Sequence, residues 1–299
     1  MVEVKYADTE LLKVGYAEDG TPGGWPVVLC HGFPYDVRAF DAVTVELTRR
    51  GARVIRPYAR GFGPTRFHSP DTLRSGEQAA LADDLRQLIG ALGLDRPIVA
   101  GYDWGGLACC GVAAVWPDLI SGLVVMASYD VIDERARHGM PPAVEYVAWY
   151  QHLFQTARGR ETLARHRHDL CLMLWRQWSP TWDFDAATYA ATAASFDNPD
   201  FVDVVVHAYR HNFGTVAGDA RYADINAALA TRPRIPVPTV TLDGSLDPLK
   251  PGGTAGDAPM FSGLHAHRVV DAGHNLPQED PGAFAHAVLT CRGLRTTAG

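Results

Sequence analysis

The chain has 299 residues, of which 47% are hydrophobic and 20% charged, which is enough for one large domain or for a core domain that carries an insertion. Its formal net charge of -7 offers no basic surface to phosphate backbones, so nucleic acid is not an expected partner. No N-terminal segment has the pattern of a secretory signal, and no apolar run approaches the roughly 18 residues that span a bilayer. We therefore expect a cytoplasmic protein with no membrane partner.

The predicted elements alternate between strands and helices in the first and last parts of the chain. Short connections between apolar strands and amphipathic helices indicate an α/β fold with a mostly parallel sheet of eight strands, covered by helices on both faces. The predicted strands are two within 2–16, then 25–30, 52–57, 97–102, 122–127, 238–242 and 266–270. The predicted core helices are 37–50, 75–92 with Ser75 as its cap, 107–116 and 281–291.

The middle of the chain has a different pattern. Strand-like runs nearly vanish between residues 129 and 225, and helical segments rich in aromatic residues replace them, such as 143–155 and 163–178. This change predicts a helical cap at 129–225, inserted between a first core part at 1–128 and a second at 226–299.

The five cysteines do not predict a chemical role. Their number is odd, and they form neither a CxxC pair nor a metal-ligand spacing, so we expect no disulfide framework and no metal. No organic cofactor is implied either. The cysteines are Cys30, Cys109, Cys110, Cys171 and Cys291.

An acidic residue stands between glycines at a predicted strand-to-helix turn. The segment Gly101-Tyr102-Asp103-Trp104-Gly105 matches the nucleophile-elbow pattern G-x-S-x-G, with Asp103 in place of serine. A side chain projected from so tight a turn strains its own backbone, and small neighbours are needed for strand and helix to pack. The alternative is that Asp103 only caps the following helix. The flanking glycines favour a nucleophile.

Two later loops offer the partners that such a nucleophile needs. His274 follows the last predicted strand in a loop that begins with Gly273, and we predict it to be the base. Asp243 and Asp247 both follow the preceding strand; we favour Asp247 as the carboxylate that orients His274, and Asp243 as a turn residue.

The loop after residues 25–30 is expected to complete an oxyanion hole. It reads His31-Gly32-Phe33-Pro34, and we expect the backbone N–H of Phe33 to pair there with that of Trp104.

An aspartate nucleophile restricts the substrate. A serine alkoxide that attacked a saturated carbon would leave an ether, which a His-activated water does not readily hydrolyse. A carboxylate leaves an alkyl ester, whose carbonyl water can attack. Asp103 therefore predicts a substrate with an electrophilic saturated carbon, and a leaving group that is either a ring-opened alkoxide or a halide. An alkoxide calls for acids of comparable pKa, such as tyrosine, whereas a halide needs only N–H donors.

The sequence resembles the α/β-hydrolase-fold epoxide hydrolases over essentially its whole length. The resemblance implies an α/β-hydrolase fold, a small-molecule epoxide and water as partners, and hydrolysis to a vicinal diol. It also implies that Tyr150, in a WYQ-L-F-Q context, and Tyr209, in a Tyr-Arg-x-Asn context, are the ring-opening acids. The residues that carry it are His31-Gly32-Phe33-Pro34, the elbow around Asp103, residues 244–247 and Gly273-His274.

Three alternatives remain open at this point. Haloalkane dehalogenases are the first, because they are similar around Asp103 and Trp104. Many of them bind halide with an asparagine at the position of Phe33, and others bind it with a tryptophan of the cap. The candidates for such a tryptophan are Trp149, Trp175, Trp178 and Trp182. A ligand-binding protein with slow turnover on the same fold is the second alternative, and a hydrolase of carbon–halogen bonds that is distinguished by halide release is the third. A homodimer is a possible assembly. Tyr58 departs from the family pattern, which usually has an aspartate there; this affects an expected structural contact and not the triad.

Overall fold

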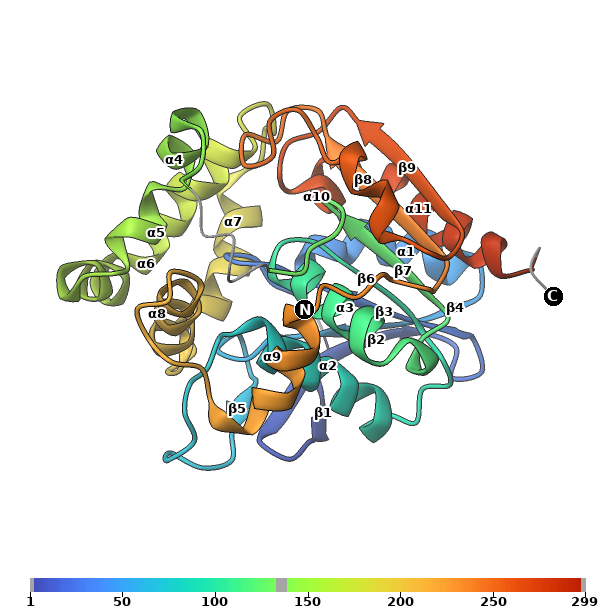
Figure 1. Cartoon of the computed structure of the whole chain (residues 1–299), viewed down its shortest axis with the longest axis horizontal. Helices are drawn as coiled ribbons and strands as arrows, with labels where there is room; N and C mark the ends of the chain where they lie inside the picture. The colour runs from blue at the N-terminus through green and yellow to red at the C-terminus, as the bar shows by residue number, and fades with distance from the viewer. Residues whose placement is uncertain (1–2, 133–138, 297–299) are drawn as a thin grey trace.

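The structure, a computed structural model, describes residues 3–132 and 139–296. Its centre is a sheet in which eight strands follow the order β1-β2-β4-β3-β6-β7-β8-β9, while β5 pairs with β2 (Figure 1). β1, β2 and β5 pair antiparallel with their neighbours. The strands β4, β3, β6, β7, β8 and β9, in their order across the sheet, are parallel to one another. The predicted α/β fold with a mostly parallel sheet is confirmed. The strands are β1 (Lys5–Asp8), β2 (Leu12–Gly20), β3 (Trp25–Cys30), β4 (Ala52–Pro57), β5 (Arg66–Phe67), β6 (Ile98–Gly101), β7 (Gly122–Met126), β8 (Thr239–Gly244) and β9 (His265–Val270).

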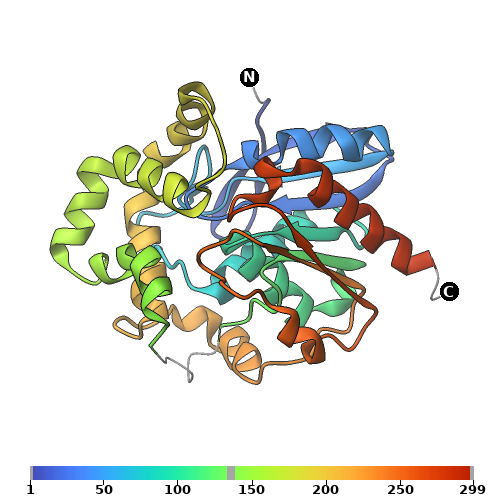
Figure 2. The ribbon, with the colours of Figure 1, turned by 90° about the horizontal axis from the view of Figure 1, so that it is seen from above.

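Helices cover both faces of the sheet. Figure 2 shows α1 (Asp41–Arg49) and α11 (Pro281–Thr296) on one face, and α2 (Gln78–Ala91), α3 (Trp104–Val115) and α9 (Ala223–Ala230) on the other. Because strands covered in this way have no solvent face, the central ones are apolar throughout, and β6 and β7 are buried along their whole length.

A third group of helices lies beyond one edge of the sheet, apart from the helices on its two faces (Figures 1 and 2). These helices are α4 (Pro142–Val147), α5 (Trp149–Leu153), α6 (Ala157–Trp178), α7 (Ala186–Ala193) and α8 (Phe201–Asn212). They fall within the segment predicted as a cap, and we call them the cap helices. The division of the chain into core and cap at residues 128 and 225 stays a prediction. The second boundary falls inside α9. Residues 1–2, 133–138 and 297–299 of the predicted parts lie outside the described residues.

The remaining short elements connect these layers. They are η1 (Val37–Phe40), η2 (Pro117–Leu119), η3 (Ala194–Asp197), η4 (Ala220–Tyr222), η5 (Ala255–Met260) and α10 (Leu276–Glu279).

Several predicted boundaries were wrong. The helix expected at 143–155 is divided at Ala148, whose φ and ψ of -98° and 10° lie outside the helical range, into α4 and α5. Ser75 does not cap α2, which begins at Gln78; its hydroxyl instead donates to the Glu77 carboxylate at 2.7 Å. The Ser75 oxygen also accepts the backbone N–H of Glu77, the residue before the helix, at 3.3 Å, so it bonds to none of the amides of α2 itself.

Tyr58 lies in the loop after β4, where the family usually has an aspartate. The residue is buried, and its ring lies so close to Gly63 that a Cβ there would come within 2.4 Å of it. The Tyr58 carbonyl accepts a hydrogen bond from the Thr65 hydroxyl at 2.7 Å. An aromatic packing contact thus occupies this position.

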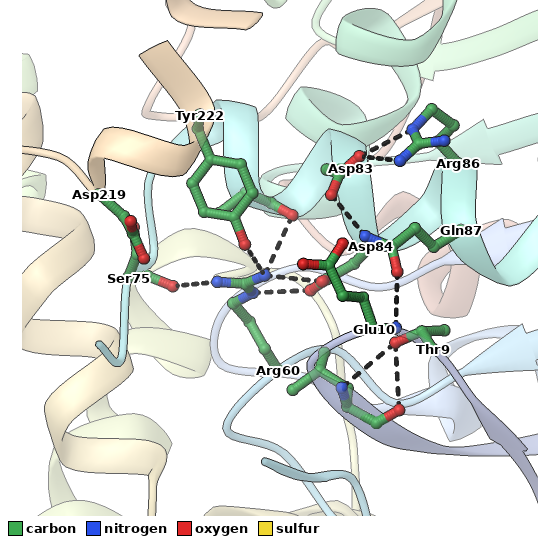
Figure 3. Close-up of polar contacts among 12 residues, drawn as sticks. Thr9, Glu10, Arg60, Ser75, Asp83, Asp84, Arg86, Gln87, Asp219 and Tyr222 are labelled. Carbon is green, nitrogen blue, oxygen red and sulfur yellow. Dashed lines mark hydrogen bonds and ion pairs between the residues drawn. The ribbon is translucent and has the colours of Figure 1, made fainter. Parts of the chain in front are cut away.

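A buried ion pair fixes the same loop against α2. The side chain of Arg60 is fully buried, and its Nε and Nη2 each donate to Asp84 at 2.6 Å. It also donates to the Ser75 carbonyl at 2.8 Å and to the Tyr222 hydroxyl at 3.1 Å (Figure 3). One guanidinium therefore joins the loop after β4 to α2 and to η4.

We expect the Arg60→Met variant to lose about 3–5 kcal/mol of the free energy of unfolding, because it leaves the Asp84 carboxylate without its cation in a desolvated site. Chemical denaturation measures the change. The control is Arg49→Met, which removes an exposed ion pair with Glu46 and should change the free energy by less than about 1 kcal/mol. Equal effects of the two substitutions would contradict a structural role for the buried pair.

Candidate active site

The functional side chains predicted from the sequence meet at one edge of the sheet. In a parallel sheet the carboxyl ends of the strands share an edge, and loops that leave there can converge. Phe33 follows β3, Asp103 follows β6, Asp247 follows β8 and His274 follows β9. Strands far apart in the sequence thus bring these residues together.

Asp103 occupies a strained turn between β6 and α3. Its φ of 51° and ψ of -127° are unusual for a residue with a side chain. The turn requires a small residue at position 105, because a Cβ on Gly105 would lie 1.9 Å from the carbonyl oxygen of Cys30. This crowding explains the glycine after the acidic residue and is typical of a nucleophile elbow.

One imidazole lies between two carboxylates. His274 Nδ1 is 2.9 Å from Oδ2 of Asp247, and its Nε2 is 3.5 Å from Oδ2 of Asp103. The other oxygen of Asp247 accepts the backbone N–H of Leu249 at 2.9 Å, which fixes the carboxylate. Asp243 lies at the end of β8, where it accepts hydrogen bonds from the amide and hydroxyl of Thr254 in the following loop. It also lies 3.2 Å from His267 Nε2, so it holds that loop to the sheet and does not contact His274.

A backbone donor holds the second oxygen of the Asp103 carboxylate. The N–H of Phe33 donates to Oδ1 at 2.7 Å. Trp104 is the first residue of α3, and a backbone N–H at a helix start has no partner within the helix. The two residues predicted for the oxyanion hole are therefore both next to Asp103, and the contact with Phe33 is a hydrogen bond.

The protonation of His274 depends on both carboxylates. Burial disfavours the imidazolium, but the charges and hydrogen bonds of Asp247 and Asp103 outweigh it and raise the pKa of His274 to about 10. An uncharged group in place of the Asp103 carboxylate would remove one of these two contributions and lower the pKa again. The base strength of His274 is thus coupled to the state of Asp103.

The two tyrosines named by the resemblance face each other from separate cap helices. Tyr150 lies on α5 and Tyr209 on α8; both are buried, and their hydroxyls are 3.2 Å apart. Gln151 Nε2 also donates to the Tyr150 hydroxyl at 3.2 Å. Burial and the charge of Asp103 raise the pKa of each phenol above its usual value of about 10, so both hydroxyls keep their protons at neutral pH.

A cavity of about 580 Å³ connects the carboxylates with the tyrosines. Asp103, His274, Tyr150 and Tyr209 all line it. The ring of Phe33 stacks on Trp104 and Tyr150, with centroids 5.5 and 6.0 Å apart, and so forms part of the apolar surroundings of the site. A concave, mostly apolar site with a few converging polar groups is typical of a pocket for a small molecule.

Sequence reasoning missed the contacts that hold the His274 loop to the cap. The backbone N–H of His274 donates to the Trp178 carbonyl at the end of α6, and Glu279 accepts hydrogen bonds from the Ser179 hydroxyl at 2.6 Å and from the Gly273 amide at 2.7 Å. Trp178 and Ser179 are distant in the sequence from the His274 loop and belong to no motif, so no sequence signal could have found these contacts.

A third carboxylate, Asp130, also lines the cavity and was not identified from the sequence. It follows β7, the strand between those that carry Asp103 and Asp247. Burial raises its pKa to about 6; the charge of Asp103 also raises it, and Lys250 opposes the shift.

Within residues 3–132 and 139–296, no group of three or more His, Cys, Asp or Glu side chains is arranged to hold a metal ion. The side chains of all five cysteines are buried. None of the helices in the described part of the chain is both long and apolar enough to cross a membrane.

Comparison with known proteins agrees with this geometry. A family model described as alpha/beta hydrolase fold matches residues 26–281. A crystal structure from Klebsiella pneumoniae, of a protein provisionally assigned as an epoxide hydrolase, is 38% identical and superimposes with a TM-score of 0.94 over 97% of each chain.

Curated relatives are more distant. Epoxide hydrolase 2 of Caenorhabditis elegans is 25% identical over 241 residues, which are 78% of this chain and 61% of the nematode protein. A haloalkane dehalogenase of Mycolicibacterium paratuberculosis is 30% identical over 148 residues, which are 50% of this chain and 47% of that protein. The chain thus spans less than two thirds of the length of these relatives. With the family match over most of its residues, it belongs to the α/β-hydrolase fold family.

Proposed function

We propose that this protein hydrolyses epoxides to vicinal diols through an ester intermediate on Asp103. The observation that carries the proposal is the single cavity that contains a carboxylate, its imidazole partner and two buried tyrosine hydroxyls. Each of these groups has a different part in the reaction. The epoxide hydrolases among its relatives support the same activity.

The first step is attack by Asp103 on a ring carbon. Because the Phe33 N–H holds Oδ1, Oδ2 is the oxygen that forms the new carbon–oxygen bond. The ring carbon–oxygen bond breaks as this bond forms, and its electron pair goes to the ring oxygen.

The ring oxygen becomes a strongly basic alkoxide unless it receives a proton. Tyr150 and Tyr209 have adjacent hydroxyls that stay protonated at neutral pH, so they can hydrogen bond to the ring oxygen and donate a proton as the bond breaks. The product of this step is a hydroxyalkyl ester.

The second step hydrolyses the ester. Esterification makes Asp103 neutral, so its charge no longer raises the pKa of His274, and the imidazolium gives its extra proton through solvent to the tyrosinate left by ring opening. The neutral imidazole can then act as a base. His274, oriented by Asp247, takes a proton from water, and the hydroxide adds to the ester carbonyl. The backbone amides of Phe33 and Trp104 stabilise the oxyanion. As the oxyanion collapses, the bond between the carbonyl carbon and the diol oxygen breaks, and this oxygen takes the proton held by His274. The Asp103 carboxyl group then returns a proton to His274 and is free as the carboxylate.

The tryptophans of the cap argue against halide as the leaving group. The indole N–H of Trp149 donates to Gln177, that of Trp175 to the Pro34 carbonyl, and that of Trp178 to the Val147 carbonyl. The rings of Trp182 and Trp175 pack against each other. A cap tryptophan that binds halide needs a free indole N–H, and three of these four indoles already have an acceptor within the protein. The position of Phe33 also has no asparagine to bind halide in its place.

We expect the His274→Ala variant to accumulate the ester, because it keeps the nucleophile and loses the base. Exposure to a panel of epoxides should add the mass of a whole epoxide to the intact protein, and peptide mapping should place the addition on Asp103. The matched control is the double variant His274→Ala/Asp103→Ala, which should gain no mass.

The same experiment separates the alternatives. A gain from haloalkanes equal to the alkyl group without its halogen, and none from epoxides, would identify a dehalogenase. A protein that binds epoxides saturably without forming an adduct or product would be a ligand-binding protein.

Replacing the acids should slow ring opening. We expect Tyr150→Phe and Tyr209→Phe each to lower kcat/KM for epoxides by roughly 10²-fold, and the double variant by at least about 10³-fold, since each removes a proton donor to the alkoxide. The control is Tyr146→Phe on α4, which changes a tyrosine that is 73% exposed and should have no effect. Full epoxide turnover by the double variant would show that other groups protonate the leaving oxygen.

A further inference from the structure

Asp130 is the carboxylate at the sheet edge that the proposed reaction leaves unused. Its side chain lines the cavity together with Asp103 and His274. Among the described residues, no hydrogen bond or ion pair to its carboxylate is found at bonding distance, whereas Asp103 and Asp247 both have such partners. Asp130 is only partly buried, and a carboxylate that has no protein donor would gain a hydrogen bond to a charged group from a ligand that supplied one.

The backbone around Asp130 is held in a defined and strained position. Ala127 and Ser128, between β7 and Asp130, have φ values of 65° and 67°, which are costly for residues other than glycine. The side-chain amide of Gln78 then fixes the chain: it donates to the Asp130 carbonyl at 2.7 Å and accepts the Ile132 N–H at 2.9 Å. Strained turns of this kind persist where the surrounding structure demands them, often at functional sites.

The carboxylate also lies against the start of α3. A Cβ on Gly106 would be 3.1 Å from Oδ2 of Asp130, so the glycine leaves room for the carboxylate beside the first turn of the helix. Asp103 immediately precedes this helix. The two carboxylates therefore flank the same helix end, where a substrate attached to one can reach the other.

His274 does not require Asp130 as a partner. Its Nδ1 is bonded to Asp247, and its Nε2 faces Asp103 at 3.5 Å. Both ring nitrogens are thus assigned to other carboxylates. This leaves the substrate as the group that Asp130 can contact.

We propose that Asp130 anchors a hydroxyl group of the substrate, so that the protein prefers epoxides that carry an alcohol on a side chain of matching length. This inference rests on the proposed epoxide hydrolase activity and narrows its substrate class. A neutral hydroxyl fits better than an ammonium group, because Lys250 also lines the cavity and His274 is protonated in the resting site, and both would repel a cation.

Matched pairs of substrates test the proposal. One member is a 1,2-epoxyalkane, and the other has a hydroxyl in place of the terminal methyl group, as 2,3-epoxypropan-1-ol does relative to 1,2-epoxybutane. Chains of increasing length are compared, and the preference is the kcat/KM of the alcohol divided by that of the alkane. A hydrogen bond to a charged group favours the alcohol roughly ten- to hundredfold at the best length.

Variants of Asp130 assign the preference to this residue. Asp130→Ala should reduce the preference to about one by slowing only the alcohol, and Asp130→Asn, which keeps an acceptor oxygen, should retain an intermediate preference. The control Asp257→Asn removes a nearby charge that does not line the cavity and should keep the preference of the unmodified protein.

The preference should also depend on pH. The charged groups facing Asp130 are Lys250, Asp103, His274 and Asp257, and the pKa of Asp130 is about 6. Because the ionised carboxylate is the stronger acceptor, the preference should rise as the pH increases through about 6. Effects of His274 act on both members of a pair and cancel in the ratio. In Asp130→Ala this dependence should disappear.

Two results would overturn the anchoring role. One is a preference near one at every chain length in the unmodified protein. The other is an equal loss for both members in Asp130→Ala, which would assign Asp130 to the reaction itself. If neither member were turned over and His274→Ala formed no adduct with either, the proposed function would fail, and this inference with it.

Discussion

Asp103 has a φ of 51° where β6 becomes α3, and this strained turn limits what its neighbours can be. Gly105 must lie against the Cys30 carbonyl, and a Cβ on Gly32 would come within 2.4 Å of the Cβ of Asp103. The same turn places the Asp103 carboxylate within hydrogen-bonding distance of the Phe33 amide and 3.5 Å from Nε2 of His274. The site is thus built around one backbone conformation that only small neighbours permit.

The three carboxylates at the sheet edge differ in the hydrogen-bond partners that each one has. Asp247 is saturated by His274 and the Leu249 amide, and Asp103 is held by the Phe33 amide but keeps one oxygen toward the imidazole. The Asp130 side chain lines the cavity, and burial raises the pKa of its carboxyl group to about 6. Three identical side chains on adjacent loops can therefore have three different roles, since environment sets the behaviour of each.

The cap helices complete the site and are tied to the loops that they cover. Trp175 donates to the Pro34 carbonyl next to Phe33, and the Trp178 carbonyl accepts the His274 amide. Because the same helices exclude water from Tyr150 and Tyr209, they also keep these phenols protonated. Moving the cap would alter the position of His274 as well as the shape of the cavity.

The sequence by itself determined the sheet and predicted Asp103, Asp247 and His274 as a triad, because strand periodicity and glycine-bounded turns are local patterns. Tyr150 and Tyr209 came from resemblance, since neither lies in a pattern that marks an acid. Only the tertiary structure brought these tyrosines to 3.2 Å from each other and showed that Asp130 lines their cavity. It also divided the helix expected at 143–155 at Ala148. Such features depend on burial and on contacts between segments far apart in the chain, which no local pattern encodes.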